Sequence, residues 1–164
     1  MELFDLVDKN DTVIGTTNKV EAHSKGLLHR VGAVYVFNER GQLYVQVHKK
    51  SGGLYDHSVG GHISQGETYD DGTRREAREE LGITQPLEKV SIFYSDEGAD
   101  MQHMFGLFQC TADPNWRFIP NDEVEEIIPM DISAIKELMK TNPEKFTGGF
   151  INTMKEYSRI VDGK

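Results

Sequence analysis

Residues 61–83 read GHISQGETYDDGTRREAREELGI, and this stretch determines most of what the sequence predicts. Its charged part predicts a helix over residues 67–81, and Gly82 suits the position just after the last helical turn. Three glutamates of this helix are spaced i, i+3 and i+4 and therefore share one face: Glu76, Glu79 and Glu80. This face is the main candidate for a functional site.

Carboxylates so close together repel one another and lower the stability of the helix unless a cation lies among them. Oxygen ligands of this kind suit Mg²⁺ or Mn²⁺. Arg75 and Arg78 flank the three glutamates, and the glycine pair at 60–61 allows a main-chain carbonyl to approach the same ion. The alternative interpretation is a solvated helix face with weak ion pairs, which charged helices often have.

The whole segment fits the pattern G-x5-E-x7-R-E-U-x-E-E-x-G-U, in which U is an apolar residue. The residues at its fixed or restricted positions are Gly61, Glu67, Arg75, Glu76, Ala77, Glu79, Glu80, Gly82 and Ile83. This pattern resembles the signature of the Nudix hydrolases. The resemblance implies an α/β fold, a Nudix-like α/β/α sandwich with a mixed β-sheet, and we expect one such domain over residues 1–164. It also implies hydrolysis of a diphosphate linkage in a nucleoside diphosphate linked to a moiety X, or in a related small phosphorylated metabolite.

The resemblance assigns roles by matching position. The implied metal ligands are Gly61, Glu76, Glu79 and Glu80, with Mg²⁺ as the expected ion and Mn²⁺ as the alternative. Glu76 is either a ligand or the base that activates water, Arg75 orients the glutamates, and Glu67 supports the loop. The implied catalytic residues are Arg75, Glu76 and Glu79.

Nudix enzymes often add an acidic ligand from outside this segment. One group of candidates lies in the stretch PNDEVEEI and consists of Glu123, Glu125 and Glu126. A second group consists of Asp96, Glu97 and Asp100. We choose Glu123 as the metal ligand; the alternative role for any of the six is surface charge.

A second resemblance covers most of residues 4–83, in DLVDKNDTVIGTTNKVEAHSKGLLHRVGAVYVFNERGQLYVQ and DHSVGGHIS. These stretches are similar to the Nudix branch that is related to isopentenyl diphosphate isomerase. In the isomerase a cysteine precedes the Gly-His pair, where this chain has Gly60. The isomerase also takes two metal-binding glutamates from the strand near residues 100–105, which reads DMQHMF here. Both departures argue against isomerase activity, which is the alternative function.

Three histidines of the isomerase metal site have approximate counterparts in His23, His29 and His62, and His103 lies in the strand that would supply the remaining ligands. Neutral imidazoles suit zinc or manganese, so a second metal site is one interpretation. The interpretation that we favour is four separate histidines that share no ion. Cys110 lies in an apolar run and is expected to pack as a small hydrophobic residue.

Composition limits the partners. The chain has 18 Lys and Arg against 27 Asp and Glu, a formal charge of −9, which argues against a nucleic acid polymer as partner. An anionic small substrate then needs cations to mediate its binding. A single cysteine excludes an internal disulfide, and the longest apolar run, 31–37, is too short to cross a bilayer. We expect a cytoplasmic protein with no membrane partner. The sequence leaves open a homodimer and a non-catalytic nucleotide-binding module, although the intact motif argues against the latter.

Hydrophobic periodicity predicts the remaining elements. The expected strands are 3–7, 12–16, 31–37, 43–48, 90–94, 101–111 and 123–129, and the expected helices besides 67–81 are a short one capped by Asn18, then 132–140 and 143–161. A type I turn at 38–41 predicts that strands 31–37 and 43–48 form a hairpin.

Overall fold

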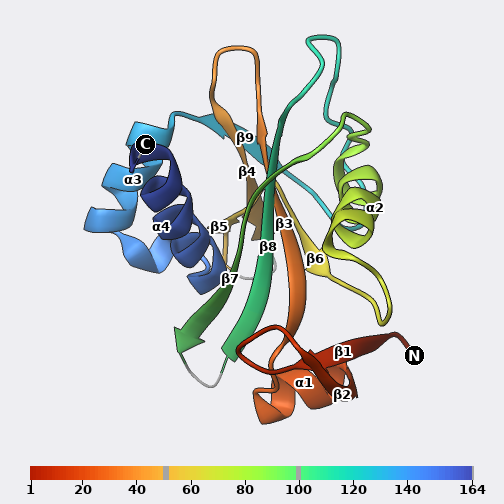
Figure 1. The fold of residues 1–164 in the computed structure, drawn as a ribbon. Coiled ribbons are helices and arrows are strands. Elements are labelled where there is room, and N and C mark those ends of the chain that lie inside the picture. The colour runs from red at the N-terminus through yellow and green to blue at the C-terminus, as the bar shows by residue number, and fades with distance from the viewer. Residues whose placement is uncertain (50–51, 99–100, 164) are drawn as a thin grey trace.

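The protein is built around a large mixed sheet (Figure 1). The structure, a computed structural model, describes residues 1–49, 52–98 and 101–163. The strands are β1 (Leu3–Val7), β2 (Val13–Asn18), β3 (His29–Phe37), β4 (Leu43–His48), β5 (Leu54–Asp56), β6 (Val59–His62), β7 (Glu88–Gly98), β8 (Met101–Thr111) and β9 (Ile127–Met130). The helices are α1 (Lys19–Lys25), α2 (Tyr69–Leu81), α3 (Ile132–Thr141), a 3₁₀ turn at Pro143–Lys145 and α4 (Gly148–Asp162). In these described ranges no helix combines the length and the apolar character that spanning a membrane requires.

Strand β3 is the centre of the sheet. It pairs antiparallel with β1, β4 and β6 and parallel with β8, while β7 adds to β8, β2 adds to β1, and β5 and β9 add to β4. Helix α2 covers one face of the sheet, α3 and α4 cover the other, and α1 lies with β1 and β2 at one end (Figure 1). The predicted α/β sandwich with a mixed sheet is therefore confirmed.

Two apolar cores fill the space between the sheet and its helices. Val34 and Val36 of β3 belong to the core that includes α2 residues such as Leu81. Ala33 and Tyr35, which point the other way, belong to the core under α3 and α4. Successive residues of a strand face opposite sides, so a strand buried on both faces must be apolar throughout. This explains the continuous apolar run at 31–37.

Three caps fix the helix boundaries; Asn18 and Gly82 are as predicted, and Thr68 starts α2 at Tyr69, two residues later than expected. The side chain of Asn18 accepts a hydrogen bond from the Glu21 amide at the start of α1, and Thr68 does the same for Asp71 at the start of α2. Gly82 ends α2 with φ at 64°, a left-handed conformation that favours glycine. These caps fix where α2 begins and ends, and hence where its glutamates lie.

The predicted hairpin between β3 and β4 is right at its turn and wrong along its length. The two strands pair only at Phe37 and Leu43, because the buried side chain of Ser58 lies between them beyond that point. The Val36 amide donates to Ser58 Oγ at 2.9 Å, and Ser58 Oγ donates in turn to the Tyr44 carbonyl. Strand β6 then takes the place beside β3 that β4 would have filled.

Two further predictions need correction. The strand expected at 123–129 is shorter and later, since only Ile127–Met130 pairs with β4. The helix expected at 143–161 is broken into a 3₁₀ turn and α4, because Thr147 is extended and caps α4 by accepting from the Phe150 amide at 3.2 Å. The break brings the first residues of α4 to the same cavity as the glutamates of α2.

Candidate functional site

A cavity of about 1140 Å³ is lined by many of the residues that the sequence singles out. Its lining combines carboxylates of α2 with several histidines and glycines. The lining includes Gly60, Gly61, His62, His23, His103, Glu76, Glu79, Glu80, Glu97 and Glu123. The two groups of ligand-type side chains therefore share one cavity.

The first group is a cluster of three carboxylates. One oxygen each from Glu76, Glu80 and Glu123 lie within 4.8 Å of one another. Glu123, chosen from outside the motif, thus joins two glutamates of α2. Glu79 lies outside this cluster: its side chain is 49% exposed and accepts a hydrogen bond from Arg75 at 3.4 Å. Its role as a metal ligand stays a prediction.

Gly61 allows this cluster to reach the main chain. A Cβ atom at position 61 would lie 2.2 Å from Cδ of Glu76, a distance that no side chain tolerates. At Gly60, by contrast, the nearest atom to such a Cβ would be His57 Nδ1 at 3.7 Å. The carboxylate of Glu76 therefore packs directly on the backbone of β6 at Gly61, where a side chain would displace it.

Arg75 connects the motif. Its guanidinium donates to both oxygens of Glu67, at 3.0 and 2.9 Å, and to Glu76 Oε1 at 2.9 Å. It also donates to the carbonyl of His62 at 3.2 Å. The Arg75 hydrogen bonds lower the pKa of Glu67, which in turn accepts from the Ser64 amide. This geometry agrees with orienting and supporting roles for Arg75 and Glu67.

Burial makes the carboxylate cluster electrostatically unfavourable without a cation. It raises the pKa of Glu80 to about 9, against the hydrogen bond from Gln46, and the adjacent Glu76 carboxylate raises this pKa further. Burial also raises the pKa of Glu76, although Arg75 opposes the shift. Crowded oxygen donors of this kind fit a hard divalent cation, which would favour their ionised forms.

Gln46 is a site residue that the sequence does not reveal. Strand periodicity places it on the face of β4 opposite Val45, as if exposed, yet it is only 4% exposed. Its side-chain amide donates to Glu80 Oε1 at 3.0 Å and to the Ser58 carbonyl at 3.1 Å. It therefore holds Glu80 in place.

The second group consists of the four histidines. The structure brings them together, and the interpretation that they share no ion stays a prediction. One ring nitrogen from each of His23, His29, His62 and His103 lie within 4.8 Å of one another. Sheet register explains the gathering: His29 lies beside His103 on the parallel pair β3–β8, and His62 pairs with Val31 two residues further along β3. These pairings join residues far apart in the sequence, so no local pattern announces them.

Three of the four histidines, His23, His29 and His62, have environments that favour the neutral form. Burial lowers the pKa of His29 to about 4 and that of His62 to about 3, and the neighbouring imidazoles lower both pKa values further. Burial also lowers the pKa of His23. A neutral imidazole has one nitrogen lone pair available, as a metal ligand requires.

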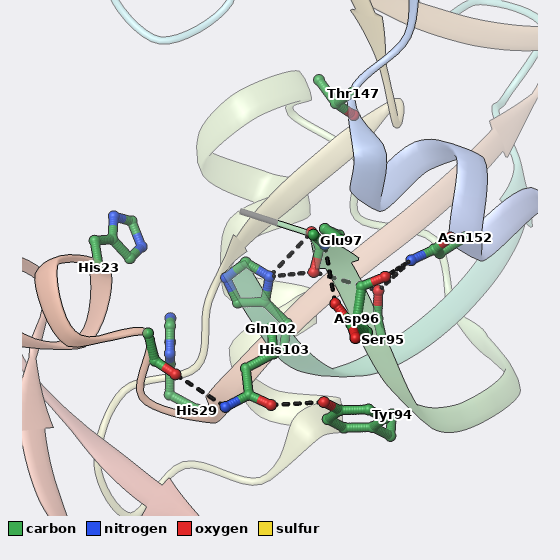
Figure 2. A network of polar contacts seen from close by, with 12 residues as sticks. His23, His29, Tyr94, Ser95, Asp96, Glu97, Gln102, His103, Thr147 and Asn152 are labelled. Atoms are coloured by element: carbon green, nitrogen blue, oxygen red, sulfur yellow. Dashed lines mark hydrogen bonds and ion pairs between the residues drawn. The ribbon is translucent and has the colours of Figure 1, made fainter. Parts of the chain in front are cut away.

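The second group of acidic candidates has a different place from the one expected. Figure 2 shows Glu97 bonded to Nδ1 of His103, at 2.9 and 3.1 Å from its two oxygens. Glu97 thus contacts the histidine cluster and not the carboxylate cluster. The Asp96 carboxylate accepts from the Gly98 amide, and Asp100 lies outside the described residues.

No thiol lines the cavity within the described part of the chain. Gly60 is exposed there, at the position of the isomerase cysteine. Cys110 lies on β8 away from the cavity, and burial raises the pKa of its thiol to about 11. It contacts the core under α2, as a small hydrophobic residue would.

Comparison with known proteins agrees with this geometry. A family model described as the NUDIX domain matches residues 27–148. An isopentenyl-diphosphate Delta-isomerase of Serratia proteamaculans is 32% identical over 94% of this chain and 90% of that protein. An uncharacterized Nudix hydrolase of Streptomyces coelicolor is 31% identical over 84% of this chain and 88% of its own length. The crystal structure of DR0079 from Deinococcus radiodurans superposes with a TM-score of 0.69 and 26% identity, covering 86% of this chain and 90% of that one. The chain belongs to the Nudix family.

Proposed function

We propose that this protein is a metal-dependent hydrolase of a diphosphate linkage in a nucleoside diphosphate-X or a related small phosphorylated metabolite. The observation that carries the proposal is the convergence of Glu76, Glu80 and Glu123 in one cavity. A protein with a formal charge of −9 needs cations to hold a diphosphate, and this cluster offers the ligands for them. The similarity to a protein named as a Nudix hydrolase supports the same class of reaction.

The residues that would hold Mg²⁺ or Mn²⁺ are Glu76, Glu80 and Glu123, with the Gly61 carbonyl and Glu79 as further ligands. When bound, a divalent cation offsets the charge of the diphosphate and lowers the pKa of a coordinated water. Hard oxygen donors fit these ions better than they fit softer ones.

The protein's own residues supply the orientation. Arg75 holds Oε1 of Glu76 at 2.9 Å, so the carboxylate that would accept a proton from the attacking water has a fixed position. Gln46 holds Oε1 of the buried Glu80 at 3.0 Å. Gly61 lets Glu76 pack directly on β6. Each contact restricts the conformational freedom of a side chain in advance, so less entropy is lost when the reacting groups are brought into position.

The test is a screen for phosphate release from nucleotide sugars, dinucleoside polyphosphates, nucleoside di- and triphosphates, coenzyme A and prenyl diphosphates, with Mg²⁺ and Mn²⁺ in parallel. We expect turnover of at least one class, lowered about 100-fold or more in Glu80→Gln and Glu123→Gln. Glu125→Gln is the matched control, because it removes a carboxylate next to the cluster. Unchanged turnover in folded Glu80→Gln protein would refute the mechanism.

The second candidate is an isomerase of an allylic diphosphate. The gathered histidines favour it, as does the 32% identity to a protein named isopentenyl-diphosphate Delta-isomerase. Gly60 argues against it, since no thiol is present there for proton transfer. Incubation with isopentenyl diphosphate, followed by NMR, should give no dimethylallyl isomer. Clear conversion would reverse the order of the two candidates.

A further inference from the structure

The histidine cluster differs in one residue type from the metal site that the resemblance to the isomerase implies. The resemblance accounts for His23, His29 and His62, and it implies glutamates on the following strand. Strand β8 begins MQHMF and contributes an imidazole, His103, in their place. The fourth ligand and the metal preference therefore depend on residues particular to this chain.

Hydrogen bonds determine which nitrogen of each buried ring is available. Nδ1 of His29 donates to the Leu27 carbonyl at 2.8 Å, which leaves Nε2 with the lone pair. That Nε2 is buried and has no hydrogen-bond partner in the described part of the chain. A buried polar atom without a partner is costly, so this nitrogen points to a ligand.

His103 has the same arrangement with a stronger partner. Its Nδ1 donates to the carboxylate of Glu97, so in the neutral ring Nε2 has the lone pair. In Figure 2 that second nitrogen is turned away from Glu97, toward the side on which His23 and His29 lie. Histidines that bind metals commonly donate their other ring N–H to a carboxylate or a backbone carbonyl, which fixes the tautomer. His103 and His29 show these two forms.

The spacing fits one ion. In a tetrahedral zinc site the nitrogen ligands lie about 3.4 Å from one another, given Zn–N distances of about 2.1 Å. Nε2 of His62 lies 3.3 Å from Nε2 of His23. The remaining ligand nitrogens are within 4.8 Å, so small side-chain rotations would bring all four to one centre.

Glu97 is itself held from several sides. It lies against the first turn of α4, where a Cβ at Gly149 would be 3.0 Å from Oε1 and one at Gly148 would be 3.2 Å from the Glu97 Cβ. Ser95 Oγ donates to Oε2 at 3.3 Å, and Asn152 of α4 donates to Ser95 in turn (Figure 2). The positive end of α4 also favours a carboxylate at this place. Glu97 is therefore a fixed support for His103.

We propose that Glu97 is the positioning residue that makes His103 the fourth nitrogen ligand of a site for a single zinc-class ion. Four imidazoles without a carboxylate suit Zn²⁺ or Co²⁺ and disfavour Mg²⁺, whereas the Glu76–Glu80–Glu123 cluster has the opposite preference. The two groups would then load different ions in one cavity. This inference does not depend on the proposed hydrolysis.

The test is titration of the metal-free protein with Co²⁺, read by the visible absorption of tetrahedral Co²⁺, with Zn²⁺ and Mg²⁺ as competitors. We expect one equivalent of tetrahedral Co²⁺, displaced by Zn²⁺ and unaffected by excess Mg²⁺. His103→Ala should lose the tetrahedral spectrum. Glu97→Gln and Glu97→Ala should bind Co²⁺ about 10-fold to 100-fold more weakly, with alanine the weaker of the two.

The controls separate positioning from folding. Glu88→Gln removes an exposed carboxylate of the same strand and should bind Co²⁺ like the wild type. Glu80→Gln should keep the Co²⁺ spectrum even where it lowers the Mg²⁺-dependent turnover expected above, so the two proposals fail separately. Circular dichroism tests whether each variant is folded, and Glu97→Asp tests for partial rescue. Equal Co²⁺ affinity in folded Glu97→Ala and wild type, or displacement of Co²⁺ by Mg²⁺, would overturn the proposal.

Discussion

Gly61 and Glu76 occupy adjoining space so closely that a Cβ atom on Gly61 would lie 2.2 Å from Cδ of Glu76. We therefore expect Gly61→Ala to displace the Glu76 carboxylate and to lower Mg²⁺-dependent turnover by about 100-fold, in line with a lost ligand or base. Gly60→Ala is the control, because its Cβ would have no contact shorter than 3.7 Å. Equal turnover in the two variants would mean that Glu76 does not need its place on β6.

Glu80 should make the stability of the metal-free protein dependent on pH. Folding raises its pKa to about 9, so the protonated form is the one that folding favours. The free energy of unfolding is then highest at low pH and falls as the pH rises from the unfolded pKa of about 4.3 toward the folded pKa. The size of this fall follows from the difference between the folded and unfolded pKa values of the one carboxyl group.

Glu80→Gln cannot ionise and keeps an acceptor for Gln46, so in EDTA its stability should fall less between about pH 6 and about pH 8.5 than that of the wild type. Urea unfolding at both pH values measures the difference. Added Mg²⁺ should stabilise the wild type and leave the variant unchanged. If the free energy of unfolding changed with pH equally in the two proteins, the raised pKa could not be assigned to Glu80.

Ser58 should contribute to stability well beyond what a serine usually does. Ser58→Ala would leave the Val36 amide without its partner between β3 and β4, at a cost of about 1–3 kcal/mol. Chemical denaturation measures this loss. Ser24→Ala, on the exposed surface of α1, should change stability by less than about 0.5 kcal/mol. A similar small effect at both positions would show that β3 and β4 separate for another reason.

Cys110 should react slowly with alkylating agents in the folded protein. Its thiol has a pKa raised to about 11 by burial, so near pH 8 the thiolate fraction is about a hundredfold below that of a free thiol. Iodoacetamide labelling, followed by mass spectrometry, should be at least about 10-fold slower in buffer than in urea. Cys110→Ala should retain full turnover. Labelling at the same rate in both solvents would contradict the burial argument.

Local sequence predicts the structural features that depend on residues close together in the chain. Asn18, Thr68 and Gly82 cap helices through atoms three or four residues away. The hairpin prediction failed for the opposite reason. A type I turn fixes only its own four residues, and Ser58, twenty-two residues from Val36, decides whether the strands stay paired.

The site residues also divide into those that local sequence predicts and those that depend on contacts between distant parts of the chain. The fixed spacing of the α2 motif places Glu76 and Glu80 on one face, whereas Gln46 is recognisable as part of the site only once β4 is placed beside Glu80. The four histidines are the clearest case. His29 and His103 are adjacent because β3 and β8 run parallel in one register, and sequence periodicity does not encode that register.

Arg75 has a consequence for how this scaffold can diverge. One guanidinium donates to Glu67, Glu76 and the carbonyl of His62, so it contacts both the carboxylate cluster and a residue of the histidine cluster. A substitution at Arg75 would disturb both clusters at once. It would therefore be selected against as long as either cluster is needed. On the two proposals made above, descendants of such a protein would change their metal use through the ligands of one cluster at a time, while the arginine between the clusters stayed fixed.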